Sequence, residues 1–126
     1  MGLFNAILGN SSEVNSEAIK KEYSKLFLED EDVQFACKLI RDTWIFTNKR
    51  LIMIDVQGLT GSKKEFHSVP YRSIYHFAVE SAGTFDMDSE FKIWVAGQNT
   101  PIVKQLKKGF DVMGLQQILA YYTCAR

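Results

Sequence analysis

The stretch 43–55, TWIFTNKRLIMID, constrains the fold of this chain more than any other part. Two runs rich in β-forming apolar residues, 43–47 and 51–55, flank the polar break 48–50. Apolar runs that stop at a short polar segment containing Asn and then resume are typical of a β-hairpin. The second run is apolar on both faces at 51–54, so we expect this strand to lie in the centre of a sheet.

The strand pattern continues on both sides of the hairpin. Runs that alternate or concentrate β-forming residues stand between turn formers, at 33–40, 63–69, 74–80, 91–95 and 102–106. After them, Asp111 is placed to cap a helix, whose apolar residues recur at helical spacing: Val112, Leu115, Ile118, Leu119 and Tyr122. The sequence therefore predicts a mainly β fold (α+β by content) of about seven short antiparallel strands, with the C-terminal helix capping an open end of a small barrel.

The N-terminal part of the chain has a different pattern, and it predicts a helical extension at 1–31 before a domain at 32–126. Apolar residues recur at helical spacing in 3–8, and again further on, at Ile19, Tyr23, Leu26 and Phe27. Two interpretations of the second apolar face remain open: it packs on the sheet, or it contacts a partner. The run of carboxylates at 29–32 indicates a solvated boundary between elements.

The charge balance argues against one large class of partner. The 15 Lys and Arg residues balance 15 Asp and Glu residues, so no net field attracts nucleic acid. No run approaches the roughly 20 apolar residues of a membrane-spanning helix. The N-terminus also lacks the basic segment and the cleavage site of a secretory signal. We therefore expect a cytoplasmic location, in which Cys37 and Cys124 are two buried free thiols, with a disulfide between them as the alternative.

No stretch has the residue pattern of a catalytic, cofactor or metal site. No serine stands in a Gly-x-Ser-x-Gly context, and the glycines of 58–61 lack the spacing and the following helix of a phosphate-binding loop. The carboxylates at 86–90 fail as a calcium loop, because Phe91 and Gly97 stand where Gly and Glu are required. His67 and His76 lie on neighbouring predicted strands and are interpreted as ordinary strand residues. We expect neither an enzyme nor a bound cofactor or metal.

Three segments carry a resemblance to a known family: RDTWIFTNKRLIMID at 41–55, QGLTGSKKEFHSVPYRSI at 57–74 and FAVESAGTFDMDSEFKIWVAG at 77–97. Over about 32–122 the chain resembles the bacterial pleckstrin-homology (PH) domains, a group long known as a domain of unknown function. The resemblance implies a strongly bent seven-stranded sheet closed by a C-terminal helix. It also implies ring-forming homo-oligomers that generally lack the lipid-binding signature of eukaryotic PH domains. The N-terminal extension lies outside the best-matching region.

The surplus of apolar side chains predicts an interaction surface. A small barrel cannot turn all of its aromatic residues inward, and a strand that is apolar on both faces needs a cover on each. We therefore expect a self-associating interaction or scaffold module that forms a homo-oligomer, for which the family resemblance implies a ring. We also expect it to contact an unidentified protein partner. The candidate interface residues are Trp44, Leu51, Met53, Trp94, Ile19, Tyr23 and Phe27.

A membrane surface or phospholipid headgroup is the alternative partner. PH domains that bind phosphoinositides place several Lys and Arg residues on the first two strands and the loop between them, where their joint charge holds phosphate. This chain has only Lys38 and Arg41 in that region, so self-association is the preferred interpretation. The candidate anion patch, including basic pairs at other turns, is Lys38, Arg41, Lys49, Arg50, Lys63 and Lys64.

Overall fold

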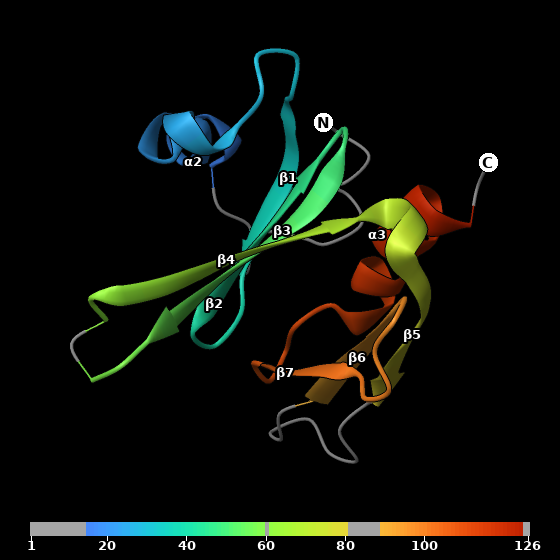
Figure 1. The fold of residues 1–126 in the computed structure, drawn as a ribbon. Coiled ribbons are helices and arrows are strands. Elements are labelled where there is room, and N and C mark those ends of the chain that lie inside the picture. The colour runs from blue at the N-terminus through green and yellow to red at the C-terminus, as the bar shows by residue number, and fades with distance from the viewer. Residues whose placement is uncertain (1–14, 60, 81–88, 125–126) are drawn as a thin grey trace.

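The computed structural model describes residues 15–59, 61–80 and 89–124, and its strands form two antiparallel sheets (Figure 1). The first sheet has the order β1-β2-β3-β4 and contains β1 (Val33–Lys38), β2 (Asp42–Thr47), β3 (Arg50–Gln57) and β4 (Lys63–Pro70). The second has the order β5-β6-β7 and contains β5 (Ile74–Glu80), β6 (Ser89–Val95) and β7 (Ile102–Leu106). The helix α3 (Val112–Thr123) follows the seven strands. This order of elements confirms the predicted fold class. Within the described residues no strand pairing joins the two sheets, so the barrel is not closed there.

From residue 15 onward, where the description begins, two short helical segments precede the sheets: α2 (Ser16–Glu22) and the 3-10 helix η1 (Ser24–Leu26). Figure 1 shows α2 beside the first sheet, away from α3. The helix predicted within 3–8 and the carboxylates Asp86 and Asp88 lie outside the described residues.

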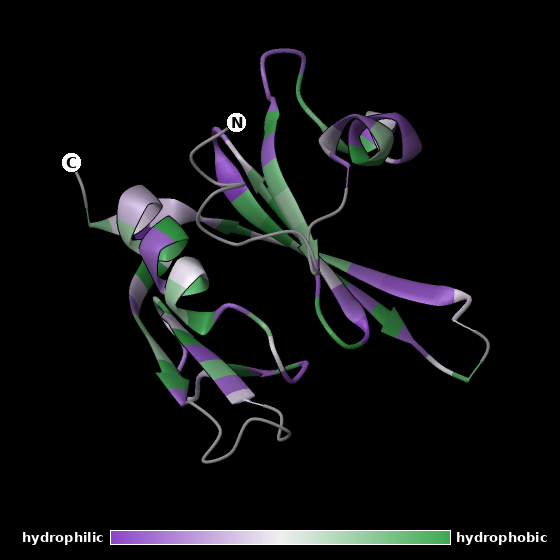
Figure 2. Ribbon diagram, turned by 180° about the vertical axis from the view of Figure 1, so that it is seen from behind, coloured by the Kyte–Doolittle hydropathy of each residue, from purple (hydrophilic) through white to green (hydrophobic). Residues whose placement is uncertain are grey.

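The hairpin at 43–55 forms the centre of the first sheet, as predicted. Its two strands, β2 and β3, pair in a register that sets Trp44 opposite Met53 and Ile45 opposite Ile52. Each of them also has a second neighbouring strand, β1 for β2 and β4 for β3. The buried apolar residues of β2 and β3 belong to two separate clusters, so both faces of the sheet centre are hydrophobic. Figure 2 shows hydrophobic residues in the centre of this sheet.

Each hydrophobic face of this hairpin is covered within the same chain. The inner face packs against the second sheet and α3, in a core that includes Trp44, Phe46, Leu51, Met53, Phe91, Ile93, Leu115 and Ile118. The outer face packs against the helical extension, in a smaller cluster of Ile19, Ala36, Ile45, Ile52 and Ile54. The apolar side of α2 therefore packs on the sheet, which decides between the two interpretations that the sequence left open.

This packing corrects the predicted interface. Three of its residues are 0–2% exposed, namely Trp44, Leu51 and Met53. The prediction is wrong for these three, because the cover on both faces of the hairpin comes from the chain itself rather than from a partner. Ile19 is buried in the outer cluster as well, and Tyr23 and Phe27 pack against it half-buried. Of the predicted interface residues, only Trp94 lies away from both clusters.

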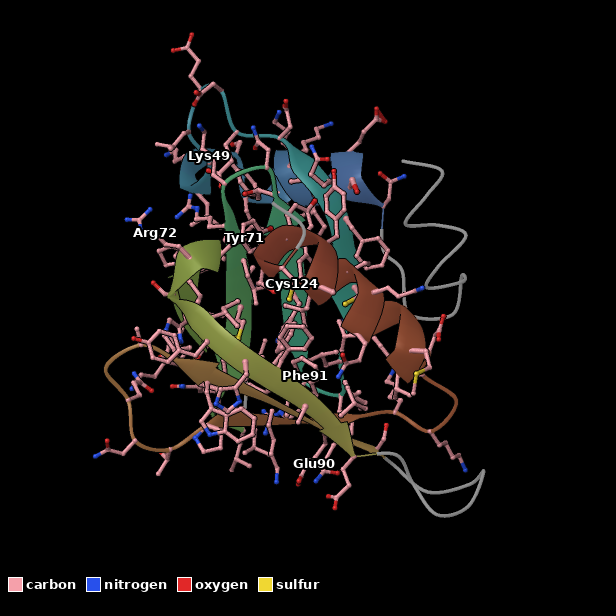
Figure 3. The ribbon with its side chains drawn as sticks, turned by 90° about the vertical axis from the view of Figure 1, so that its right-hand side faces the viewer. Lys49, Tyr71, Arg72, Glu90, Phe91 and Cys124 are labelled. Atoms are coloured by element: carbon pink, nitrogen blue, oxygen red, sulfur yellow. The ribbon has the colours of Figure 1, made fainter. Side chains whose placement is uncertain are left out.

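The helix α3 covers the space between the two sheets. Asp111 accepts a hydrogen bond from the Gly114 N–H over 3.0 Å, which confirms the predicted N-cap. Near the other end, the Tyr122 ring stacks on Tyr71 of the 3-10 helix η2 (Tyr71–Ser73), with 4.4 Å between the ring centroids. Figure 3 shows Tyr71 beside this end of α3. The Tyr71 hydroxyl donates to the Thr47 carbonyl over 2.7 Å, which ties the helix end to the turn after β2.

Candidate functional site

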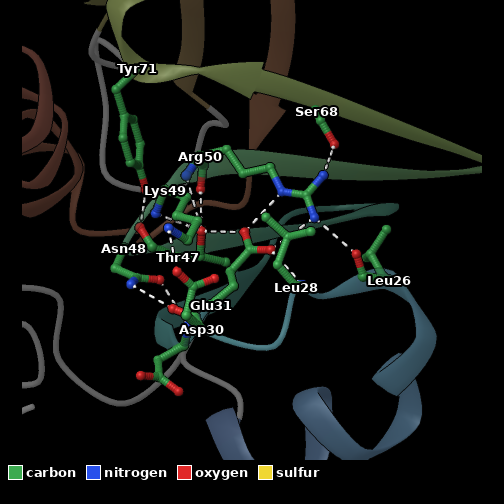
Figure 4. Close-up of polar contacts among 11 residues, drawn as sticks. Leu26, Leu28, Asp30, Glu31, Thr47, Asn48, Lys49, Arg50, Ser68 and Tyr71 are labelled. Carbon is green, nitrogen blue, oxygen red and sulfur yellow. Dashed lines mark hydrogen bonds and ion pairs between the residues drawn. The ribbon is translucent and has the colours of Figure 1, made fainter.

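The turn between β2 and β3 holds a buried carboxylate (Figure 4). The Glu31 side chain is fully buried, and Arg50 donates to both of its oxygens, over 2.8 Å from Nε and 2.9 Å from Nη2. Thr47 Oγ1 donates to Glu31 Oε2 over 2.7 Å, and the Leu28 N–H donates to Oε1 over 3.1 Å. The prediction of a solvated boundary at 29–32 is therefore wrong for Glu31, which is the centre of a buried polar network.

The rest of the turn also binds the N-terminal segment. Arg50 Nη2 donates to the Leu26 carbonyl over 2.9 Å, and Asn48 Nδ2 donates to the Asp30 carbonyl over 3.1 Å. Lys49 Nζ lies 3.1 Å from the Asp30 carboxylate. We call this set of contacts the turn clamp. Arg50 is therefore not a free cation for an external anion, whereas Lys49 forms an ion pair that stays exposed to solvent.

The electrostatics of the turn clamp keep Glu31 ionised. Burial alone raises the pKa of Glu31, but hydrogen bonds from Arg50, Thr47 and the Leu28 N–H outweigh it and lower this pKa to about 2. The hydrogen bond to Glu31 raises the pKa of Arg50 in turn. The two charges therefore stabilise each other at neutral pH, in the bidentate geometry that Arg and carboxylate prefer.

Three other cations of the predicted patch meet in a groove. The groove has a volume of about 580 Å³ and lies between α2 and the outer face of the first sheet, lined by Lys38, Arg41, Lys64 and Tyr23 among others. Arg41 Nη2 donates to the Gly58 carbonyl over 3.2 Å, which holds the β1–β2 turn against the β3–β4 loop. Lys64 Nζ lies 5.5 Å from the centre of the Tyr23 ring, within the range of a cation–π contact.

The six predicted cations therefore form no single patch. Arg50 pairs with Pro70 at the start of β3, whereas Lys64 pairs with Val56 near its end, so the turn clamp and the groove lie at opposite ends of this strand. Lys63 precedes Lys64 on β4 and does not line the groove. Because successive side chains of a strand point to opposite faces, Lys63 and Lys64 serve different surfaces.

The outer side of the second sheet carries exposed apolar side chains. The His76 ring of β5 stacks on Trp94 of β6, with 4.3 Å between the ring centroids. Tyr75 stands at a bulge beside His76 and is 73% exposed, and Val103 of β7 is 43% exposed. We call this surface the aromatic face and define it by Tyr75, His76, Trp94 and Val103. The sequence marked Trp94 but missed Tyr75, whose exposure depends on the bulge.

The remaining candidate groups form no reactive cluster in the described part of the chain. His67 lies on β4 and His76 on β5, which belong to different sheets, so the two predicted neighbouring strands do not pair. Among residues 15–59, 61–80 and 89–124, no group of three or more His, Cys, Asp or Glu could hold a metal ion. Both cysteines are free, but only Cys37 is buried, so the prediction of burial is wrong for Cys124. Burial raises the pKa of the Cys37 thiol to about 12, so this thiol is a poor nucleophile. No described helix is long and apolar enough to cross a membrane.

Comparison with known proteins finds a matching family model, similar sequences and solved structures of the same fold. A family model for the bacterial PH domain matches residues 2–123, so the match includes the N-terminal extension. The uncharacterized protein YjqA of Bacillus subtilis (strain 168) is 49% identical over 121 residues, which cover 95% of this chain and 97% of YjqA. The crystal structure of a pleckstrin homology domain from Shewanella amazonensis SB2B is 50% identical, with a TM-score of 0.82, and the match covers 97% of this chain and 98% of that one. A protein with a pleckstrin-homology domain from Shewanella loihica PV-4 is 51% identical, with a TM-score of 0.78 and coverage of 91% and 98%.

Proposed function

The chain belongs to the bacterial PH domain family, and on this premise we propose that it is a non-enzymatic interaction module that assembles with further copies of itself. The observation that carries the proposal is the aromatic face beside the free edge of β5. In the described residues β5 pairs only with β6, so its other edge has no partner strand. An open strand edge beside exposed aromatic side chains is the kind of surface that pairs with another chain.

A second copy of the chain is the partner that the charges and the topology favour. The formal net charge is 0, so no long-range repulsion keeps two copies apart. Within the described residues β4 and β5 each have one edge without a neighbouring strand. A contact between β5 of one copy and β4 of the next is head-to-tail, and such contacts close into a ring when the rotation between copies permits it. Backbone hydrogen bonds would supply the pairing, and Tyr75 and Trp94 the apolar area.

A charge placed on the aromatic face is expected to weaken self-association. Tyr75→Glu would bury an unpaired carboxylate in the contact, and we expect at least a roughly tenfold rise in the dissociation constant between copies. The measurement is the molar mass from light scattering coupled to size-exclusion chromatography, over a range of micromolar concentrations. Met113→Glu is the matched control, because Met113 is 65% exposed on α3 and receives the same charge. A wild type that is strictly monomeric, or equal shifts in the two variants, would contradict the proposal.

Membrane-surface binding remains the second candidate function, and the convergence of three cations in one groove is the observation that favours it. Arg50 does not contribute, because it is paired with the buried Glu31 carboxylate, and Lys49 lies outside the groove in an exposed pair with Asp30. Co-sedimentation with vesicles that contain phosphatidylserine tests this candidate. Charge-driven binding should be measurable at low salt and lost at high salt. The absence of binding at low salt would remove it.

A further inference from the structure

We propose that Lys104 and Asp42 condense into an intramolecular amide bond, an isopeptide bond, and that Asp55 carries the proton in this reaction. Lys104 lies on β7 and Asp42 at the start of β2, so the bond would join the second sheet to the first. No strand pairing joins the two sheets within the described residues. The reaction takes place once per chain and turns over no substrate, so it is independent of the proposed self-association.

The two reacting groups are in contact and largely shielded from water. Lys104 Nζ lies 2.6 Å from Asp42 Oδ2, and 23% of the Lys104 side chain and 7% of the Asp42 side chain are exposed. The carboxyl carbon is bonded directly to this oxygen, so the nitrogen is close to the atom that it would attack. Reacting groups held in this way reach effective molarities of about 10⁵–10⁸ M, which favours condensation over hydrolysis of the amide.

Aromatic side chains of both sheets surround the pair. Phe91 is the register partner of Lys104 on β6, and Trp44 follows Asp42 by two positions on the same face of β2. The Trp44 and Phe91 side chains are fully buried, and their rings meet edge-on with 5.4 Å between the centroids. An apolar site penalises the two charges of an ion pair but not a neutral amide. These surroundings therefore favour the condensed product.

Asp55 distinguishes this site from an ordinary buried ion pair. It stands opposite Asp42 in the register of β2 and β3 and shares a hydrogen bond with it. Burial raises the pKa of Asp42, whereas the hydrogen bond from Asp42 lowers the pKa of Asp55, and the charges of Lys104 and Arg41 lower it further. A proton bound by the pair therefore resides on Asp42. The site thus places a neutral carboxyl group, which an amine can attack, beside an ionised carboxylate that can act as a base.

Two carboxylates opposite each other on neighbouring strands destabilise a sheet, so the stability of the ion pair does not explain Asp55. A catalytic role does. In the reaction Asp55 accepts a proton from the Lys104 ammonium group, and the nitrogen lone pair then attacks Cγ of protonated Asp42. The N–C bond forms, the C–OH bond breaks, and the hydroxyl group leaves as water with a second proton from the nitrogen. The products are the amide, one water molecule and protonated Asp55, which returns its proton to the solvent.

A small pocket gives the released water an exit. It has a volume of about 220 Å³ and is lined by both reacting residues, together with Leu39, Ile40 and two others. The pocket opens beside the β1–β2 turn, and Figure 1 shows β7 on the side of the second sheet that faces this turn. Departure of the water through this opening would leave an apolar site in which hydrolysis of the new bond is slow.

Mass spectrometry of the intact, purified chain tests the proposal. We expect a mass lower than that of the sequence by the mass of one water molecule. Tryptic digestion should then yield a branched peptide that joins residues 42–49 to residues 93–107, because a modified Lys104 is no longer a cleavage site. This peptide identifies both residues of the bond.

Three variants separate the bond from the ion pair. Lys104→Arg preserves the charge opposite Asp42 but not the amine, so it should fold and keep the full mass of its sequence. Asp55→Asn keeps a hydrogen-bonding group beside Asp42 but cannot take up a proton. The dehydrated fraction, followed over time from a fresh preparation, should therefore grow slower by roughly 100-fold or more. Lys92→Arg is the matched control, because Lys92 forms an ion pair with Glu90 over 3.8 Å, and it should lose water as the wild type does.

A wild-type chain that keeps the full mass of its sequence would overturn the proposal, and this result depends on no variant. Loss of water that persists in Lys104→Arg, or that yields no branched peptide, would indicate a cyclic imide at an aspartate and would overturn it as well. An Asp55→Asn chain that loses water at the wild-type rate would refute the role of Asp55. Circular dichroism reports whether each variant is folded, and light scattering of the same samples measures self-association separately.

Discussion

Replacement of Arg50 by alanine is expected to lower the free energy of unfolding by about 3–5 kcal/mol, the usual cost of removing one partner of a buried ion pair. The variant leaves the fully buried Glu31 carboxylate without its counter-ion and removes the contact to the Leu26 carbonyl. The N-terminal segment should then detach from the sheet more easily, because the turn clamp is its main polar attachment. Urea denaturation followed by tryptophan fluorescence gives the size of the loss.

A control and the pH dependence make this prediction specific. Lys49→Ala removes an exposed ion pair with Asp30, and its cost should stay below about 1 kcal/mol. Because the pKa of Glu31 is lowered from 4.5 to about 2, its stabilising contribution is present above pH 4.5 and is lost as the pH falls toward 2. The wild type should lose about 3 kcal/mol in this window from this group, at about 1.36 kcal/mol per pKa unit. Arg50→Ala should not show this loss; identical acid profiles for the two proteins would refute the role of the turn clamp.

Trp44→Ala is expected to lower the free energy of unfolding by about 3–5 kcal/mol, because it opens a cavity in the main core. The Trp44 side chain is fully buried, and its ring meets the Phe91 ring edge-on at 5.4 Å between centroids, which joins β2 of the first sheet to β6 of the second. Loss of this contact should weaken the packing of the two sheets against each other. Thermal unfolding by circular dichroism, combined with urea denaturation, measures the effect.

The same variant separates a core role from an interface role. Trp94→Ala is the matched control, because Trp94 is half-buried on the aromatic face. Its replacement should lower the free energy of unfolding much less than replacement of Trp44. It should instead weaken self-association, whereas Trp44→Ala at a concentration where it is folded should not change the contact between copies. Unchanged stability in Trp44→Ala with a changed oligomer mass would restore the interface role that the sequence suggested for this residue.

The secondary structure was largely predictable because it depends on local patterns. The hairpin at 43–55, the strand order along the chain and the helix capped by Asp111 all follow from side-chain period and turn residues. The division into two sheets was not predictable from these patterns, since it depends on which strand edges meet. The bulge that exposes Tyr75 is likewise a matter of pairing between β5 and β6.

The candidate sites were harder to predict, because a residue type does not reveal its partner. Arg50 and Lys64 look equivalent in the sequence, as basic residues in or near turns. In the structure Arg50 forms an ion pair with Glu31, 19 positions earlier in the chain, whereas Lys64 lies in the groove beside Tyr23. The carboxylate run at 29–32 gave no sign that one of its members is buried, since burial of a charge needs a partner that only the fold supplies.

The hairpin at 43–55 shows where this boundary falls. Its sequence alone determined that two strands form there, that they turn at 48–50 and that both faces are apolar, because these properties reside in neighbouring residues. The tertiary structure decided what covers those faces and what the polar turn binds: the second sheet and α3 on one side, α2 on the other, and Glu31 at the turn. Burial and charge pairing depend on segments that are distant in the sequence, and only the folded chain brings those segments together.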